Sequence, residues 1–448
     1  MVSTLPSALS ASYIACMDAS ITPTPIRKPF DITVTPPGSK SLTNRALVLG
    51  ALARGESMIR NVLVAEDTHV MLESLQRLGF GLSMSDNNRT VHLTGGAGVV
   101  PATEAELFCG NSGTTIRFLT ALCSLGNGRY LLDGIERMRQ RPIRELVDLL
   151  KNLGARISYV QSDGTPPLRL EARGLAGGLA RFGAAQSSQF LSAALQVASL
   201  ARNEVEIELA PGQTSWPYVA MTMQLMDEFG VTCELTRDPK TGAPRQINVP
   251  KSPLIAADYT VEPDASAASY FLAAAAINEG SRVRIAGLGK RSLQGDIGFA
   301  DLLRKMGVFV KVTDDAMTAE GTGELESITA DLSGMPDMAQ TLAVVCLFAE
   351  GESRLTGLHT LRHKETDRLA ALKVELEKMG AKASIDGDSL TIEPPEVVRG
   401  ANIETYNDHR MAMSFAVAST RANGVTILNP ACVGKTYPDF FDDFARFA

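Results

Sequence analysis

The same local pattern occurs six times along this chain: a short turn of small polar or acidic residues leads directly into an apolar helical segment. The helices are expected to start at Ser39, Asn111, Ser187, Asp264, Asp337 and Asp408, which are 72, 76, 77, 73 and 71 residues apart. Solenoid repeats have shorter periods, of roughly 20–50 residues. The spacing therefore predicts six small α/β modules rather than a rod.

A second marker keeps the same spacing. Apolar helical segments end at five glycines, Gly79, Gly154, Gly230, Gly307 and Gly380. Glycine commonly follows a helix because it adopts the left-handed backbone conformation without strain. Segments of alternating hydrophobicity come next and are predicted to be strands, at residues 155–160, 231–235, 308–312 and 382–385. The predicted module is strand, helix, strand, helix, strand, strand.

The sixth module is short, because the chain ends after its expected second helix at residues 440–448. A strand at residues 30–35, with alternating Phe30, Ile32 and Val34, is expected to complete it. The length of 448 residues and the 45% of hydrophobic residues are enough for two cores. The sequence predicts an N-terminal domain at residues 38–258 and a C-terminal domain at residues 17–37 plus 259–448, closed by the N-terminal strand.

The first residues of the chain stand outside the repeat. Residues 1–16 form an extension with no place in the repeat, and either Met1 or Met17 could be the start of the protein. The first 29 residues lack the basic segment and apolar core of a secretory signal.

Composition narrows the function classes. The net charge is −7, which argues against a nucleic-acid-binding chain, and no apolar stretch approaches the roughly 20 residues of a membrane span. The six Cys have no CxxC spacing and the five His have no HExxH or His/Cys ligand spacing, so no metal is expected. A soluble, cytoplasmic protein is predicted, and since nothing marks a subunit interface, a monomer.

Cations follow several of the expected helix starts. Lys40 and Arg45, Arg117 and Arg410 lie within the first turns of their helices. Any one start alone could be an ordinary N-cap, since Ser, Asn and Asp are preferred there. However, a cation in the first turn opposes the helix dipole, which suggests that an anion binds at these helix ends.

The segment at residues 364–368 combines two cations with an acid. On a helix, Lys364 and Arg368 lie four apart on one face, which is unfavourable by a few tenths of a kcal/mol. A solvated charged face is one explanation. The other is that Glu365 points into a cationic pocket and transfers protons. Arg141 and Lys435 are cations in turn-rich contexts and would be surface charges if considered alone.

Together these motifs resemble the 5-enolpyruvylshikimate-3-phosphate (EPSP) synthase family of enolpyruvyl transferases, from about Phe30 to the C-terminus. The most specific pieces are Pro-Gly-Ser-Lys-Ser from residue 37 with Asn44 and Arg45, Gly-Asn-Ser-Gly-Thr from 110, Arg-Pro-Ile from 141, Ser-Ser-Gln from 187, Asp-Ala-Ser-Ala-Ala-Ser-Tyr from 264, Lys-Glu-Thr-Asp-Arg from 364, Asn-Asp-His-Arg from 407 and Lys-Thr-Tyr-Pro-Asp from 435. The resemblance implies two domains, each of three βαβαββ units with helices inside and sheets outside.

The resemblance also implies the substrates, shikimate 3-phosphate and phosphoenolpyruvate, and no cofactor. By motif, shikimate 3-phosphate would be held by Lys40, Ser41, Arg45, Ser187, Ser188, Gln189, Ser215, Tyr218, Asp337 and Lys364. Phosphoenolpyruvate would be held by Lys40, Asn111, Gly113, Arg141, Gln189, Arg368, Arg410 and Lys435. Gly113 is implied to leave room for the inhibitor glyphosate.

The implied chemistry is addition followed by elimination, which needs a base and an acid. Asp337 is the expected proton acceptor and Glu365 its partner in proton transfer, with Lys40 and His409 assisting. Two positions depart from the pattern of many relatives, with Thr360 in place of Asn and Phe118 in place of Pro.

Two alternatives remain at this point. The sister activity transfers the enolpyruvyl group to UDP-N-acetylglucosamine, but the Ser-Ser-Gln and Lys-Glu-Thr-Asp-Arg motifs argue against it. A non-catalytic anion-binding protein could keep the same fold, but the presence of both Asp337 and Glu365 argues against that.

Overall fold

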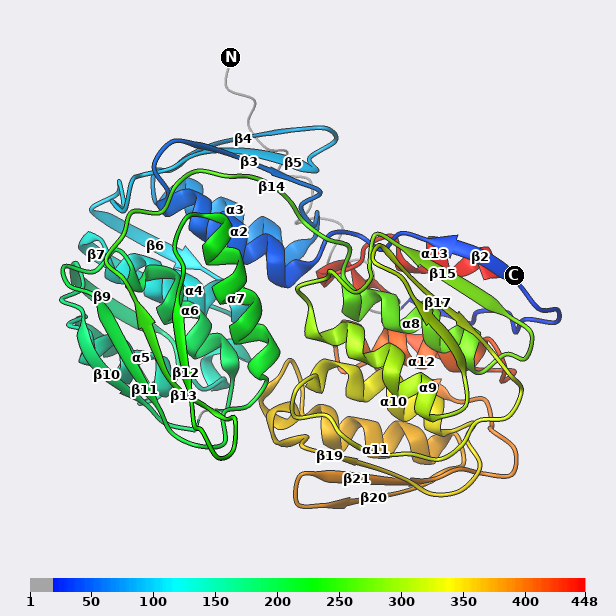
Figure 1. Cartoon of the computed structure of the whole chain (residues 1–448). Helices are drawn as coiled ribbons and strands as arrows, with labels where there is room; N and C mark the ends of the chain where they lie inside the picture. Colours follow the sequence, from blue (N-terminus) through cyan, green and yellow to red (C-terminus); the bar gives the residue numbers. More distant parts are fainter. Residues whose placement is uncertain (1–18, 185, 448) are drawn as a thin grey trace.

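The computed structural model describes residues 19–184 and 186–447, so the predictions for residues 1–16 and Met17 lie outside the described residues. The described chain forms two bodies, each with its own buried hydrophobic core (Figure 1). In Figure 1 the first body is coloured mainly from blue to green and the second mainly from yellow-green to red, with the blue segment that contains Asp31–Val34 also on the second body.

Three modules contain all their elements in the predicted order. The second comprises β6 (Glu104–Phe108), α4 (Gly113–Ser124), β7 (Asn127–Asp133), α5 (Arg144–Asn152), β8 (Ile157–Tyr159) and β9 (Leu168–Arg173). The third comprises β10 (Gly178–Phe182), α6 (Ser188–Ala198), β11 (Val205–Leu209), α7 (Trp216–Glu228), β12 (Glu234–Arg237) and β13 (Pro244–Val249). The fifth comprises β18 (Thr329–Asp331), α10 (Ala339–Cys346), β19 (Ser353–Thr356), α11 (Arg368–Lys378), β20 (Lys382–Asp386) and β21 (Ser389–Glu393). Each sheet has the order first, second, fourth, third strand, with only the first pair parallel.

The first and fourth modules take their first strands from distant parts of the chain. The first contains α2 (Lys40–Leu52), β3 (Glu56–Arg60), α3 (Glu66–Arg77), β4 (Gly81–Ser85) and β5 (Thr90–Thr94). Its parallel edge strand is β14 (Asp258–Thr260), which pairs with β3. The fourth contains α8 (Ala265–Ala276), β15 (Arg282–Ala286), α9 (Phe299–Lys305), β16 (Phe309–Val312) and β17 (Ala316–Glu320). Its edge strand is β2 (Asp31–Val34), parallel to β15 (Figure 1).

The strand predicted at residues 30–35 therefore exists but lies in the fourth module, so its placement in the sixth was wrong. The strand that directly precedes the fourth module in sequence, β14, pairs with β3 of the first module. The edge of β15 is therefore left for a parallel partner from elsewhere in the chain, and β2 takes that place. The sixth module contains β22 (Asn402–Ile403), α12 (His409–Ser419), β23 (Thr426–Leu428) and α13 (Phe440–Phe444). The short β1 (Ser20–Ile21) pairs antiparallel with β23.

The two connections between the bodies run side by side. Ser39 N–H donates to the Glu262 carbonyl and Asp264 N–H to the Pro37 carbonyl, both at 2.8 Å. Gly38 lies between them, and a Cβ there would be 1.9 Å from the Asn61 carbonyl oxygen, so only glycine fits. The domain bounds at residues 38 and 258 remain a prediction, and the second of them coincides with the first residue of β14.

Helices fill the interior of each body and sheets cover the outside (Figure 1). Every residue of the alanine-rich α8 is buried, as expected for a helix that is apolar on all sides. Four expected starts are N-caps: Ser39, Ser187, Asp264 and Asp408. All five glycines expected to end helices have positive φ. In the described part of the chain, no helix has the length and apolarity needed to cross a membrane.

Two expected starts differ in detail. Ser112, next to Asn111, caps α4. Asp337 lies in the 3-10 turn η4 (Pro336–Met338) that precedes α10, so its carboxylate is not used as a cap.

Candidate active site

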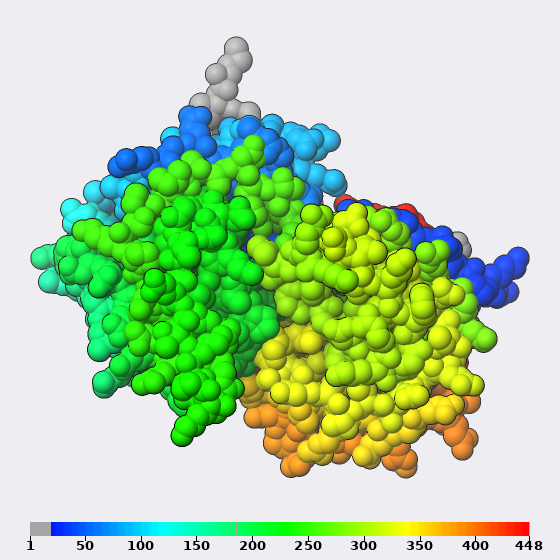
Figure 2. Space-filling model, in the orientation of Figure 1, coloured from blue at the N-terminus to red at the C-terminus, as the bar shows by residue number. Residues whose placement is uncertain are grey.

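A cavity between the two bodies collects the first turns of several helices. It is lined by Lys40, Ser41 and Arg45 of α2, Gly113, Thr114 and Arg117 of α4, Ser188 and Gln189 of α6, Arg368 of α11 and Arg410 of α12, among others. Seven Lys or Arg and three Asp or Glu line it. Together with the unpaired N–H groups of the helix ends, this excess of cations suits anionic ligands. Figure 2 shows the two bodies in contact.

Asp337 is surrounded by three cations on the second body. Its carboxylate accepts from Arg410 Nη2 at 2.9 Å and from Arg368 Nη1 at 3.1 Å, and Lys364 Nζ lies 3.3 Å away. Burial alone would raise the pKa of Asp337, but Arg410, Lys364 and Arg368 hold it well below its usual range. Asp337 is therefore ionised at neutral pH.

Arg368 joins three carboxylates while being only 1% exposed. Its guanidinium donates to both oxygens of Asp408, at 2.7 and 3.2 Å, to Asp337, and to Glu365 at 2.9 Å. Burial would lower the pKa of Arg368, but Asp408, Glu365 and Asp337 raise it above its ordinary value. The planar fork of arginine makes this arrangement possible.

Lys435 links the second body to Asp67 of α3 on the first body, and Lys40 of the first body meets the same carboxylate. The Lys435 ammonium donates to the Asn111 carbonyl at 2.9 Å and lies 3.4 Å from Glu365 and 3.6 Å from Asp67. Lys40 Nζ lies 3.2 Å from the other Asp67 oxygen. Burial opposes ionisation of Glu365, but Arg368 and Lys435 hold its pKa well below its usual range.

Arg141 is held against the start of α4. Its Nη1 donates to the Asn111 carbonyl at 3.0 Å. A Cβ at Gly113 would be 2.5 Å from Arg141 Nη2, so the glycine allows the guanidinium to lie directly over the helix end. The Arg141 Nε is buried without a hydrogen-bond partner, so this arginine keeps a donor unused.

Arg117 fixes the side chain of Gln189. Its Nη1 donates to Gln189 Oε1 at 2.5 Å, and its guanidinium stacks 4.9 Å from the centre of the Phe190 ring. Burial, with Arg141 nearby, lowers the pKa of Arg117 to about 9, which leaves it charged at neutral pH. The amide of Gln189 donates to Thr114 at 3.1 Å, so both ends of Gln189 are defined.

Arg45 is buried as deeply as Arg368. It is 1% exposed and donates to Thr222, the Ser41 carbonyl, Ser192 and the Tyr218 carbonyl. Phe118 lies beneath it, with its ring centre 5.2 Å from the guanidinium carbon, so this aromatic ring supports a cation of the site.

Known proteins resemble this chain along most of its length. The family model described as EPSP synthase (3-phosphoshikimate 1-carboxyvinyltransferase) matches residues 25–444.

This chain belongs to the EPSP synthase family.

The similarity between this chain and its relatives extends over nearly the whole length of each protein. A 3-phosphoshikimate 1-carboxyvinyltransferase of Shewanella baltica is 44% identical over 413 residues, which cover 91% of this chain and 95% of that protein. One of Shewanella piezotolerans is 44% identical over 421 residues, covering 93% and 96%. The structure of an EPSP synthase from Acinetobacter baumannii superposes with a TM-score of 0.79 at 26% identity, over 96% of this chain and 98% of that one. The enolpyruvyl transferase NikO from Streptomyces tendae, with a TM-score of 0.72 at 19% identity over 95% of each chain, shares the fold.

Most of the residues that the EPSP synthase resemblance implied lie around the one cavity. They are Lys40, Ser41, Arg45, Gly113, Arg141, Ser187, Ser188, Gln189, Ser215, Tyr218, Asp337, Lys364, Glu365, Arg368 and Arg410. Asn111 and Lys435 line a second hollow between the bodies, from which Lys435 reaches Glu365 of the cavity.

His409 lies behind the cavity of this EPSP synthase family member rather than on its wall. It is buried, and neither ring nitrogen has a hydrogen-bond partner. Burial, Lys40 and Arg410 lower its pKa well below the ordinary value, so the imidazole is neutral.

Several residues of the site were not assigned to a substrate or to catalysis from the sequence. Arg117 carried a signal as a cation in a first turn, and Asp408 as an N-cap within a motif. Asp67 carried none, because an acidic residue in the first turn of α3 is ordinary. Thr360 lines the cavity with its hydroxyl buried and unpartnered.

Proposed function

We infer that this chain transfers the enolpyruvyl group of phosphoenolpyruvate to the 5-hydroxyl of shikimate 3-phosphate and releases phosphate, in the shikimate pathway to aromatic amino acids. Membership of the EPSP synthase family supports the reaction. The structural observation that carries it is the ionised Asp337, held by Arg368, Arg410 and Lys364 in a cationic cavity between two bodies.

The two substrates are proposed to bind on different cations of this cavity. Shikimate 3-phosphate would lie toward α2, α6 and α7, with Arg45, Ser188 and Tyr218 among its partners. Phosphoenolpyruvate would lie between Arg141 and Lys435 on one side and Arg368 and Arg410 on the other. Helix N-termini and guanidinium forks are suited to carboxylate and phosphate groups. Lys40 lies between the two sets.

Asp337 is proposed to accept the proton of the attacking 5-hydroxyl. While three cations surround it, its low pKa makes it a weak base. When the anionic groups of phosphoenolpyruvate share Arg368 and Arg410, part of that positive field is neutralised and the Asp337 pKa should rise. The base would thus become effective only when both substrates are present.

Glu365 is proposed to transfer the proton at C3. It is ionised while Arg368 and Lys435 surround it. When the anionic groups of phosphoenolpyruvate share these cations, the Glu365 pKa should rise, so that the carboxylate takes up the proton that it then gives to C3. The 5-hydroxyl oxygen attacks C2 while C3 gains a proton, and the tetrahedral intermediate then loses phosphate and a C3 proton. Glu365 lies between Arg368 and Lys435, the cations assigned to phosphoenolpyruvate. Lys40, which lines the cavity, and His409, whose neutral imidazole lies behind the cavity wall, would assist these proton transfers. The cations stabilise the shifting charge, a role in which single donors are often worth about 10²–10³-fold in rate.

Further expectations follow from this assignment. Because the site has walls on both bodies, substrates should drive closure, and scattering profiles unchanged by shikimate 3-phosphate plus inhibitor would contradict this. Glyphosate is proposed to inhibit, since Gly113 lies on the cavity wall beside Arg141. Full activity at high glyphosate in a phosphoenolpyruvate-limited assay would refute that. A monomeric, cytoplasmic enzyme is also proposed, and sedimentation tests the first point.

The deciding experiment measures phosphate release from phosphoenolpyruvate with shikimate 3-phosphate, with UDP-N-acetylglucosamine and without an acceptor. Release only with shikimate 3-phosphate is expected. Release only with the sugar nucleotide would keep the chemistry but overturn the acceptor. No release with either would indicate a binding protein.

A further inference from the structure

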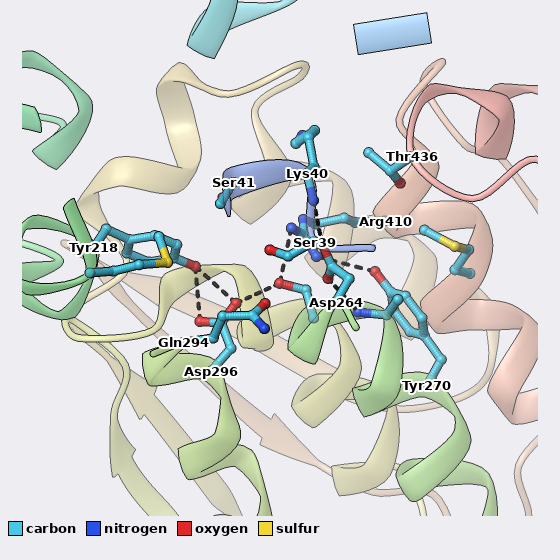
Figure 3. A pocket seen from close by; sticks show the side chains of 14 residues that line it. Ser39, Lys40, Ser41, Tyr218, Asp264, Tyr270, Gln294, Asp296, Arg410 and Thr436 are labelled. Carbon is cyan, nitrogen blue, oxygen red and sulfur yellow. Dashed lines mark hydrogen bonds between the residues drawn. The ribbon is translucent and has the colours of Figure 1, made fainter. Parts of the chain in front are cut away.

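Asp296 is a buried carboxylate on the second body that contacts the first. It lies in the short helix η3 (Gly295–Gly298) and is 4% exposed. The Tyr218 hydroxyl, on α7 of the first body, lies 2.8 and 2.9 Å from its two oxygens. The Ser266 hydroxyl donates to the same carboxylate at 2.5 Å. Figure 3 shows the Tyr218 hydroxyl pointing at Asp296.

This contact continues into the proposed catalytic groups. Arg410 Nη2 donates to Ser266 Oγ at 3.3 Å and to Asp337 at 2.9 Å. A continuous line of hydrogen bonds therefore runs from Tyr218 through Asp296 and Ser266 to Arg410 (Figure 3). It joins a residue assigned to shikimate 3-phosphate with one assigned to phosphoenolpyruvate.

The backbone around Asp296 fits closely against α7. A Cβ at Gly295 would be 2.3 Å from the Pro217 Cβ, so the chain passes directly over the first turn of α7. Ser215 N–H donates across the contact to the Ser333 carbonyl at 2.9 Å. Bonds of this kind exist only while the two bodies are together.

The chemistry of a phenol limits what Tyr218 can do. A tyrosine hydroxyl has one proton and two lone pairs. When Asp296 is ionised, the Tyr218 hydroxyl donates its one hydrogen to that carboxylate, and the Tyr218 oxygen can then only accept a hydrogen bond from a ligand hydroxyl. Burial, with Asp337 nearby, raises the pKa of Asp296 to about 6, so it is mainly ionised at neutral pH.

We propose that Asp296 is a positioning residue that orients the Tyr218 hydroxyl as an acceptor for a hydroxyl of shikimate 3-phosphate and couples this contact to closure of the two bodies. The proposal rests on the proposed function, because that function assigns Tyr218 to this substrate.

Asp296→Asn is the direct test. One amide oxygen can accept from Tyr218 or Ser266, and the amide N–H₂ cannot accept from either. The KM for shikimate 3-phosphate should rise about 10- to 100-fold, the range expected for loss of a hydrogen bond to a charged group. The KM for phosphoenolpyruvate should change at least ten times less. Asp301→Asn, at a 68% exposed side chain one turn along the same segment, is the matched control and should behave as wild type.

A double-mutant cycle separates positioning from general damage. Tyr218→Phe should raise the same KM, and adding Asp296→Asn should raise it no further, because both changes remove one contact. Scattering should show less closure on addition of shikimate 3-phosphate for Tyr218→Phe than for wild type, which tests the coupling even if Asp296→Asn does not fold.

Any of four results would overturn the proposal. Two concern Asp296→Asn: an unchanged KM for shikimate 3-phosphate, or equal rises in the KM values of both substrates. The others are KM effects that multiply in the double mutant and a Tyr218→Phe protein that closes as wild type does. Absence of turnover by wild type and Asp301→Asn would overturn the proposed function, and this inference with it. Turnover by both with Asp296→Asn unchanged would overturn this inference alone.

Discussion

Gly113→Ala tests the contact between Arg141 and the start of α4. The new Cβ would stand 2.5 Å from Nη2, 2.8 Å from Cζ and 3.0 Å from Nη1 of Arg141. Ordinary van der Waals contact begins near 3.4 Å, so the guanidinium must move by about 1 Å. Its hydrogen bond to the Asn111 carbonyl, now 3.0 Å, would be lost or bent. A misplacement of about 1 Å at a positioning group can cost about 100-fold in rate.

The assay is phosphate release at varied concentrations of each substrate. For Gly113→Ala, kcat/KM for phosphoenolpyruvate should fall about 100-fold, while the KM for shikimate 3-phosphate stays within about twofold. Gly183→Ala is the control, because a Cβ there meets nothing within 4 Å. A normal kcat/KM for phosphoenolpyruvate in Gly113→Ala, or equal losses for both substrates, would refute the reasoning.

Three more predictions follow from the site. Arg368→Lys keeps the positive charge but loses the planar guanidinium that bonds to Asp408, Asp337 and Glu365. The free energy of unfolding in denaturant should therefore fall by about 2–4 kcal/mol. The control is Arg304→Lys at an exposed position, for which the free energy of unfolding should stay within about 0.5 kcal/mol of wild type. An unchanged midpoint for Arg368→Lys would contradict this. Thr360→Val removes a hydroxyl that lines the cavity and is buried without a hydrogen-bond partner. If this hydroxyl bonds to shikimate 3-phosphate, the KM for that substrate should rise about 2- to 10-fold without loss of stability. An unaltered KM would show that the hydroxyl does not contact the substrate. The pKa of Asp296, which is surrounded by Tyr218, Ser266, Asp337 and Arg410, is raised to about 6, so its carboxylate is charged above that pH and neutral below it. The KM for shikimate 3-phosphate should therefore rise below pH 6 more in wild type than in Asp296→Asn. Parallel pH profiles of this KM in the two proteins would contradict the prediction.

The sequence predicted the module and its repetition well, because these depend on local signals. Caps such as Ser187 and Asp264 act on the turn that follows them, and glycines such as Gly230 end helices through their own φ. The assignment of strands to sheets was not local. Both β2 and β14 lie just before a helix of the same kind, so nothing in either segment indicates that the first and fourth modules take each other's strand.

The cations of the site were visible in the sequence for an energetic reason, since a first-turn Arg or Lys opposes the helix dipole unless an anion is present. The acids were harder to predict. Asp67 favours the dipole at its own helix start, and Asp296 is likewise an acidic residue in the first turn of a short helix, so neither violates a local rule. Each of them also meets a residue that lies far away in the sequence on the other body, Lys435 in one case and Tyr218 in the other.

The pairing of β3 with β14 has a consequence for synthesis on the ribosome. Residues 58–60 pair with residues 258–260, so the first sheet cannot be completed until those later residues have been synthesised. At about 5–20 residues per second, translation of the intervening chain takes about 10–40 s. During that time one edge of β3 has free N–H and C=O groups, which can pair with other chains. A chain that stalls before residue 260 should therefore aggregate instead of accumulating as a stable half-protein.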